Sequence, residues 1–155
     1  MRKTVTKEEA LVSMASLCAR SEQCEADIYK KLLNKGLSHG DIREIIEELI
    51  NREFIDNARF ARSFANDKVR FSAWGRNKIR AALMAKRISS IDTAEALAQI
   101  DEKEYAAALS RAVKSKVSGL DLSVYEDRLK LYRHLLSRGF ESSLASSAVK
   151  KLSSE

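Results

Sequence analysis

The 155-residue sequence contains no proline, only five glycines and only two cysteines. Because proline and glycine mark most turns between strands, their scarcity argues against a fold built from β-hairpins. Ala, Leu, Lys, Arg and Glu dominate the sequence instead, and these residues favour helices. The sequence therefore predicts an all-α protein, and its 45% hydrophobic content is enough for a globular core.

The sequence also lacks a long apolar run. No stretch approaches the roughly 20 apolar residues of a membrane span, and residues 1–10 are not followed by an apolar core of signal-peptide length. We therefore expect a cytoplasmic protein that does not bind membranes. Cys18 and Cys24 have a spacing that fits neither a CxxC redox pair nor a zinc knuckle. We predict that both are reduced thiols that pack between helices.

Sequence signals for catalysis and for bound cofactors are missing as well. Gly36 and Gly40 lack the lysine and hydroxyl residues of a nucleotide-binding loop. His39 and His134 have no cysteine or carboxylate at the spacing of a metal site. The sequence predicts no catalytic residue, no cofactor, no metal and no small-molecule substrate. It leaves open a catalytic serine or cysteine whose histidine and acid partners lie far away in the sequence.

An internal repeat is the strongest pattern in the sequence. Residues 28–49, 79–100 and 131–152 align without a gap after shifts of about fifty residues. The spacing of apolar residues within each segment predicts two helices that flank a turn. The apolar residues that coincide are Leu32, Leu83 and Leu135; Leu33, Met84 and Leu136; Leu37, Ile88 and Phe140; Ile46, Leu97 and Val149; and Leu49, Ile100 and Leu152.

The residues at the predicted helix ends support this interpretation. Gly36 and Gly139 stand where the first helix of their segment should end, and glycine adopts a left-handed backbone there at low cost. A cation in the last turn of a helix is stabilised by roughly 0.3 to 1 kcal/mol, which gives the basic residue before each stop a structural explanation. These cations are Lys35, Lys86 and Arg138. The candidate N-caps of the second helix are Ser38, Ser89 and Ser90. Asp41 and Asp92 suit the first turn of that helix, where an acid is favourable.

Each segment is preceded by a further apolar-periodic stretch, at 10–19, 60–69 and 105–113, which predicts a third helix. We therefore expect three tandem three-helix repeats with boundaries at 1–54, 55–100 and 101–155. A unit of about fifty residues buries little apolar surface alone, so the repeats should stack into an elongated, curved array of undetermined handedness. Such a monomer would offer a long binding face rather than a pocket.

The net charge of +6 is concentrated in one part of the sequence. Residues 68–87 contain seven cations and no acid, and Trp74 lies among them, a composition that suits contact with a polyanion or a protein. A structural explanation also exists, because Trp74 suits a core anchor and helical geometry turns some cations away from any one surface. The seven cations are Lys68, Arg70, Arg76, Lys78, Arg80, Lys86 and Arg87.

A helix-turn-helix DNA-binding protein shares the outline of helix, glycine-containing turn and helix. In that motif the second helix enters the major groove, where acidic side chains are repelled by the phosphates. The corresponding segments 41–50 and 92–100 read DIREIIEELI and DTAEALAQI, which disfavours base-specific recognition by the first two repeats. Lys150 and Lys151 leave the third repeat open.

Three motifs carry a resemblance to a known family. The first is DIYKKLLNKG at 27–36, the second is FIDNARFARSF at 54–64, and the third is WGRNKIRAALMAKRIS at 74–89. They resemble the motifs of the RecX family of RecA modulators, and the likeness covers nearly the whole chain. Two residues depart from the family pattern: Asn57 stands where a second aspartate is common, and Arg87 replaces a glycine that usually follows the helix.

The resemblance implies a regulatory protein without enzymatic activity, whose curved array lies in the helical groove of the RecA–DNA filament. It implies inhibition of RecA ATPase, strand exchange and co-protease activity, and so a role in recombination, DNA repair and the SOS response. DNA would be contacted weakly or through RecA. The expected contact residues are Lys68, Arg70, Trp74, Arg76, Lys78, Arg80, Lys86 and Arg87.

Two alternatives to RecA regulation stay open at this point. One is a general nucleic-acid-binding helical protein that acts without RecA, with an affinity that falls steeply with salt. The other is an enzyme, which turnover of a phosphodiester or a nucleotide would reveal. A pull-down with and without RecA separates the first alternative from a RecA regulator.

Overall fold

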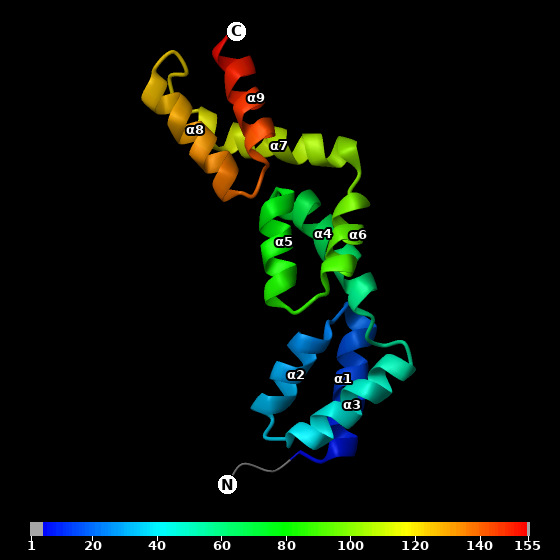
Figure 1. The fold of residues 1–155 in the computed structure, drawn as a ribbon. Coiled ribbons are helices and arrows are strands. Elements are labelled where there is room, and N and C mark those ends of the chain that lie inside the picture. Colours follow the sequence, from blue (N-terminus) through cyan, green and yellow to red (C-terminus); the bar gives the residue numbers. More distant parts are fainter. Residues whose placement is uncertain (1–4, 155) are drawn as a thin grey trace.

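The structure, a computed structural model, describes residues 5–154, and within them it contains nine helices and no strand. This confirms the predicted all-α fold (Figure 1). The helices are α1 (Lys7–Arg20), α2 (Glu25–Asn34), α3 (His39–Asn51), α4 (Asn57–Ser72), α5 (Arg76–Ala85), α6 (Ser90–Ala98), α7 (Glu102–Val117), α8 (Tyr125–Ser137) and α9 (Ser142–Ser153).

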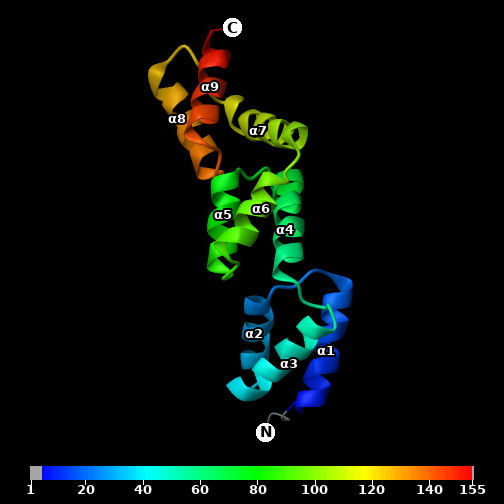
Figure 2. The ribbon, with the colours of Figure 1, turned by 45° about the vertical axis from the view of Figure 1, so that its right-hand side comes forward.

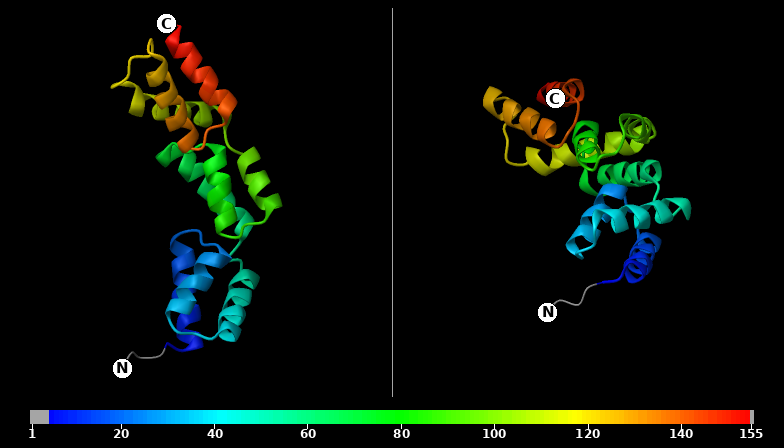
Figure 3. Two further views of the ribbon diagram at one scale, coloured as in Figure 1. Left: turned by 60° about the vertical axis from the view of Figure 1, so that its left-hand side comes forward. Right: turned by 60° about the horizontal axis from the view of Figure 1, so that its bottom comes forward.

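The helices form three successive groups of three, which we call repeat 1 (α1–α3), repeat 2 (α4–α6) and repeat 3 (α7–α9). The repeats stack end to end, with repeat 1 and repeat 3 at opposite ends of the molecule (Figures 1 and 2). A bend along the stack is visible in Figure 3, and the prediction of an elongated, curved array is therefore confirmed. The exact boundaries at 1–54, 55–100 and 101–155 stay a prediction, and residues 1–4 and 155 within them lie outside the described part.

Side-chain caps explain where most of the helices begin. In five helices the residue before the first turn accepts a hydrogen bond from a backbone N–H three positions later, which satisfies a donor that the helix itself leaves free. Ser38 and Ser89 cap α3 and α6 as predicted, whereas Ser90 is the first residue of α6. The five capping residues are Thr6, Ser38, Asp56, Ser89 and Asp101.

The turn after the middle helix has the same geometry in all three repeats. Gly36 and Gly139 adopt positive φ angles of 84° and 95°, and Arg87 adopts 59° at the equivalent position. In each case the backbone N–H of this residue donates to the carbonyl three residues earlier, at 2.9 to 3.0 Å. Arg87 therefore preserves the turn despite replacing a glycine, at a local cost on the order of 1 kcal/mol.

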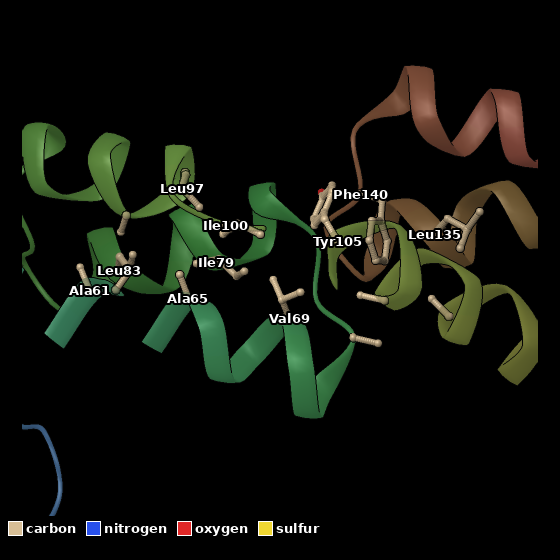
Figure 4. Close-up of a cluster of buried hydrophobic side chains, with 14 of the residues drawn as sticks. Ala61, Ala65, Val69, Ile79, Leu83, Leu97, Ile100, Tyr105, Leu135 and Phe140 are labelled. Atoms are coloured by element: carbon tan, nitrogen blue, oxygen red, sulfur yellow. The ribbon is translucent and has the colours of Figure 1, made fainter. Parts of the chain in front are cut away.

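The buried side chains form two separate cores. The first core lies inside repeat 1, around residues such as Ile28, Leu32 and Ile45. The second, which we call the shared core, runs without a break from repeat 2 into repeat 3 and includes Leu83 and Phe140 (Figure 4). Repeats 2 and 3 are therefore one hydrophobic unit.

Both cysteines are free and lie among packed helices, as predicted. Cys24 is fully buried and is a repeat 1 residue that reaches the shared core, whereas Cys18 is half-buried against the first core. Burial raises the pKa of both thiols, because a thiolate is poorly solvated there. The thiols are therefore protonated near neutral pH.

Repeats 2 and 3 meet through their backbones at two glycines. The N–H of Gly75 donates to the carbonyl of Arg138 at 2.7 Å, and the N–H of Asn77 donates to the carbonyl of Gly139 at 2.9 Å. A Cβ atom at Gly75 would overlap the backbone of Gly139 and Phe140. The close approach of α5 to the turn between α8 and α9 therefore requires glycine.

Repeats 1 and 2 meet mainly through polar side chains, and Cys24 and Ala26 of repeat 1 add an apolar contact with the shared core. The side-chain oxygen of Asn57 accepts from the N–H of Glu25 at 3.0 Å, and the Asn57 amide donates to the Glu25 carboxylate at 2.7 Å. Arg59 pairs with Glu22 at 2.5 Å across the same joint. An aspartate at position 57 would offer no amide donor to Glu25, so the asparagine at this position has a structural reason.

We predict that Gly75→Ala lowers the free energy of unfolding by about 1 to 3 kcal/mol, because the added methyl group forces the two repeats apart. Thermal or urea unfolding followed by circular dichroism measures this change. Gly119→Ala is the matched control, since a Cβ there meets open space, and it should leave stability unchanged or slightly higher. Equal stability of the two variants would refute a requirement for close approach.

Candidate interaction surface

The middle helices α2, α5 and α8 line one long edge of the molecule, which we call the middle-helix edge (Figures 1 and 2). Helix α5 lies at its centre and carries three cations and no acid. The third helices of the first two repeats have the opposite charge, since α3 carries four acids and one cation, and α6 carries two acids and no cation. Positive and negative charge are therefore separated in repeat 2.

Three of the seven expected contact cations are held by carboxylates of neighbouring repeats. Arg76 pairs with Glu102 and Glu141, each at 3.0 Å, and its side chain is only 19% exposed. Arg70 pairs with Glu104 at 2.8 Å, and Lys86 pairs with Asp27 at 2.8 Å. Arg70 and Arg76 thus link repeat 2 to repeat 3, and Lys86 links repeat 2 to repeat 1.

The other four cations form no ion pair with any carboxylate of residues 5–154. Arg80 is exposed and donates a hydrogen bond to the side chain of Asn77 at 2.7 Å. Arg87 is also exposed, at the end of α5 that faces repeat 1. The four residues are Lys68, Lys78, Arg80 and Arg87, and their charge is available to a partner.

Trp74 lies between α4 and α5, with a lysine from each helix over its ring. The ammonium of Lys68 is 4.7 Å from the ring centroid and that of Lys78 is 4.5 Å away. The indole is half-buried, packs against the shared core and meets Phe64 edge-on, with 6.3 Å between the ring centroids. Trp74 therefore anchors the core and also holds two cations beside each other at the surface.

The available cations do not converge on one spot. Lys78 and Arg80 flank the fully buried Ile79, so helical geometry places them on opposite sides of the core-facing stripe. Lys78 lies beside Gly139 of repeat 3, whereas Arg87 faces repeat 1 at the far end of the helix. A partner that contacts all of them must extend along the length of α5.

Each middle helix also presents one apolar side chain to solvent at the same repeat position. These residues are Leu33, Met84 and Leu136, which are 41%, 59% and 38% exposed. The sequence pattern grouped them with the recurring apolar positions, but the neighbouring position, occupied by Leu32, Leu83 and Leu135, is the fully buried one. An exposed apolar residue that recurs in every repeat is a candidate contact for a partner.

A hydrogen-bonded network joins repeats 2 and 3 beside the glycine contact. The Tyr105 hydroxyl donates to Glu141 and accepts from the backbone N–H of Arg76 at 2.9 Å, while the Arg76 guanidinium lies 3.9 Å from the centroid of the Tyr105 ring. Burial, together with the bond to Glu141, raises the pKa of Tyr105. Burial opposes ionisation of Glu141, but hydrogen bonds from Tyr105, its own backbone and Arg76 lower its pKa below the usual value.

Neither histidine belongs to a cluster of three potential metal ligands among the described residues. His39 contacts Tyr29, and His134 lies 3.3 Å from the hydroxyl of Ser115. Across residues 5–154 no three potential metal ligands come together. None of the helices described has both the length and the apolar character that crossing a bilayer requires.

A family model described as "RecX, second three-helix domain" matches residues 56–97. A relative from Clostridium tetani named "Regulatory protein RecX" is 33% identical over 125 residues, which are 78% of this chain and 56% of the relative. A relative of the same name from Prosthecochloris aestuarii is 31% identical over 121 residues, which are 78% of each chain. The chain belongs to the RecX family.

Solved RecX structures have the same fold. RecX from Lactobacillus salivarius matches with a TM-score of 0.78 at 18% identity, over 94% of this chain and 96% of that one. A structure of a "regulatory protein RecX" matches with a TM-score of 0.79 at 22% identity, over 94% of this chain and 71% of that one. The chain spans less than two thirds of some RecX relatives, namely 56% of the protein from C. tetani and 63% of one from Clostridium botulinum.

The segment 56–97 that matches the RecX domain contains all seven expected contact cations. The basic run at 68–87 lies within repeat 2, but the sequence did not separate the paired cations from the available ones. The carboxylates that pair with them lie 26 to 65 positions away along the chain. No local sequence signal identifies such partners.

We predict that Arg76→Ala lowers the free energy of unfolding by about 1 to 3 kcal/mol, because it leaves the partly buried Glu141 without its cation. Arg80→Ala removes the same charge from an exposed position and should change stability by less than about 0.5 kcal/mol. Urea unfolding of both variants measures the difference. If Arg80→Ala proves as destabilising as Arg76→Ala, our division into paired and available cations is wrong.

The lowered pKa of Glu141 predicts a pH dependence of stability. A carboxylate with a depressed folded-state pKa stabilises the fold above its unfolded pKa of about 4.5, and this contribution is lost as the pH falls through the folded value. The free energy of unfolding of the wild type should therefore exceed that of Glu141→Gln at about pH 7, and this difference should disappear below about pH 4. Unfolding curves at a series of pH values measure it, and a gap independent of pH would contradict the prediction.

Proposed function

We propose that this RecX-family chain binds the RecA nucleoprotein filament in the cytoplasm and inhibits its ATPase, strand-exchange and co-protease activities. Such inhibition would modulate recombination, DNA repair and the SOS response. Family membership supports a regulatory role, because the curated relatives carry the name "Regulatory protein RecX". RecA as the partner is proposed from the motifs at 27–36, 54–64 and 74–89 that resemble this family.

The observation that best supports a filament as the partner is the spread of available charge along an elongated molecule. Lys78 and Arg87 lie at opposite ends of α5, and the stack continues beyond both ends (Figure 1). A filament presents a long surface with repeated subunits, and an elongated monomer bridges several of them. Cations that are not neutralised within the chain are free to meet acidic protein surface or phosphate.

Within this proposal the eight expected contact residues have different roles. We assign direct contact to Lys68, Lys78, Arg80 and Arg87, whose charge has no carboxylate partner among residues 5–154. Trp74 is proposed to position Lys68 and Lys78 through its ring. The three cations with inter-repeat partners, Arg70, Arg76 and Lys86, are proposed to set the relative placement of the repeats.

We predict that the double reversal Lys78→Glu and Arg80→Glu raises the half-inhibitory concentration against RecA ATPase on single-stranded DNA by at least about tenfold, a loss of roughly 1.4 kcal/mol. Titration of RecA ATPase with each variant measures it, and circular dichroism checks that helicity is unchanged. The two single reversals show which flank of α5 contributes more, because the side chains point to opposite sides.

The matched control is Lys114→Glu with Lys116→Glu. These two exposed cations of α7 have the same spacing in sequence as Lys78 and Arg80, and the double reversal changes the net charge equally. The control variant should inhibit RecA like the wild type. Inhibition that survives the reversal on α5, or falls equally in the control, would mean that the contact assignment is wrong.

Nucleic-acid binding without RecA is the second candidate function. The absence of acids from α5 favours it, because an unopposed run of cations attracts phosphates. The acidic α3 and α6 argue against base-specific recognition by repeats 1 and 2. A direct nucleic-acid binder would retain a single-stranded oligonucleotide in the absence of RecA, with an affinity that falls steeply with salt, whereas a RecA regulator is pulled down by RecA.

A further inference from the structure

A groove lies between α2 and α3, at the joint where repeat 1 meets repeat 2. Its volume is about 860 Å³, and Lys86 and Arg87 of repeat 2 form one of its sides. Leu33 and Ile50 border it and are 41% and 40% exposed. Apolar side chains therefore line an open groove that no part of the described chain fills.

A second groove, of about 370 Å³, lies between α8 and α9 of repeat 3. The register that aligns residues 28–49 with 131–152, continued a few residues beyond both ends, places seven of its lining positions on lining positions of the first groove. The same repeat positions therefore form a groove in both repeat 1 and repeat 3. Three of the matched pairs are Ala26 and Leu129, Tyr29 and Tyr132, and Ile46 and Val149.

The two grooves share a pattern of side chains. A half-buried tyrosine, Tyr29 or Tyr132, forms one wall from the middle helix. A nearly buried aliphatic residue, Ile46 or Val149, forms the floor from the third helix. Two helices with an apolar strip between them form the kind of groove that accepts the apolar face of a third helix.

Both grooves carry an excess of positive charge. The cations that line the first groove outnumber its two acids, Glu25 and Glu47. Of these cations, Lys30, Arg43 and Arg87 are exposed and pair with no carboxylate among the described residues. The second is lined by Arg128 and Lys150, and none of its lining residues is acidic. The charge around the apolar strips therefore complements an acidic ligand.

We propose that each groove binds a short, acidic, amphipathic helical segment of a partner protein. The apolar residues of the segment would pack on the tyrosine and the aliphatic floor, and its carboxylates would meet the cations on the rims. The apolar floor suits aliphatic side chains better than a sugar–phosphate backbone.

This inference goes beyond the proposed RecA inhibition, since of the four cations assigned to direct contact Arg87 alone lines one of these grooves, and neither groove includes Trp74. Two equivalent grooves make one chain bivalent. A partner that presents the acidic segment twice, on adjacent subunits, would bind more tightly than an isolated segment, because the second contact becomes intramolecular. The test below contains no RecA, so its outcome is independent of the ATPase experiment.

The probe is a synthetic peptide of about 16 residues with leucines at helical spacings i, i+3, i+4 and i+7 and with glutamate and alanine elsewhere. Isothermal titration calorimetry against the full chain should give two peptides per chain. Arg43→Glu in the first groove and Lys150→Glu in the second should each reduce the number to one, and the double variant should bind none. Lys114→Glu on α7 has the same charge change outside both grooves and should still bind two.

Three further results would overturn the proposal. The first is a stoichiometry that both groove variants leave unchanged, and the second is equal binding of a peptide in which lysine replaces every glutamate. The third is displacement of the peptide by an equimolar single-stranded oligonucleotide, which would make phosphate the preferred occupant. Circular dichroism of each variant confirms folding, and sedimentation shows whether a second copy of the chain occupies the grooves instead, which would also overturn the proposal.

Discussion

The stacking of repeats 2 and 3 depends on the close contact of two backbones at Gly75 and Gly139. Without a side chain on either residue, the start of α5 reaches the carbonyls that follow α8 and donates two hydrogen bonds to them. Only at this separation do the apolar faces of the two repeats merge into one core, which includes Phe140 and Leu83 (Figure 4). The ion pairs of Arg76 with Glu102 and Glu141 surround this contact and complete the joint.

Charge in repeat 2 therefore has two separate uses. The cations nearest the joints pair with carboxylates of neighbouring repeats, and the pairs of Arg76 with Glu141 and of Lys86 with Asp27 are partly buried, which strengthens them. The cations on the flanks of α5 and beside Trp74 keep their charge for a partner. A single basic run in the sequence thus contains both the residues that hold the array together and the residues we propose to contact the filament.

Much of the fold follows from the sequence, because local rules determine most of it. The alignment of Leu32, Leu83 and Leu135 marked a fully buried position in each repeat, and Ser38 and Ser89 marked two helix starts. The site was less predictable, because it depends on contacts between distant residues. Asp27 and Lys86 are 59 positions apart, and nothing in either neighbourhood indicates the other. The grooves arise where neighbouring side chains leave space between two helices. The spacing of apolar residues in the sequence does not specify where such space is left.

The two joints of the molecule differ in their physical character. A continuous apolar core makes the link between repeats 2 and 3 stiff, whereas the link between repeats 1 and 2 relies mainly on hydrogen bonds and ion pairs around Asn57 and Arg59. Small polar contacts of this kind permit relative motion of the parts that they connect. Repeat 1 is therefore the part of the array with the most freedom to change its orientation, whereas repeats 2 and 3 move together as one body.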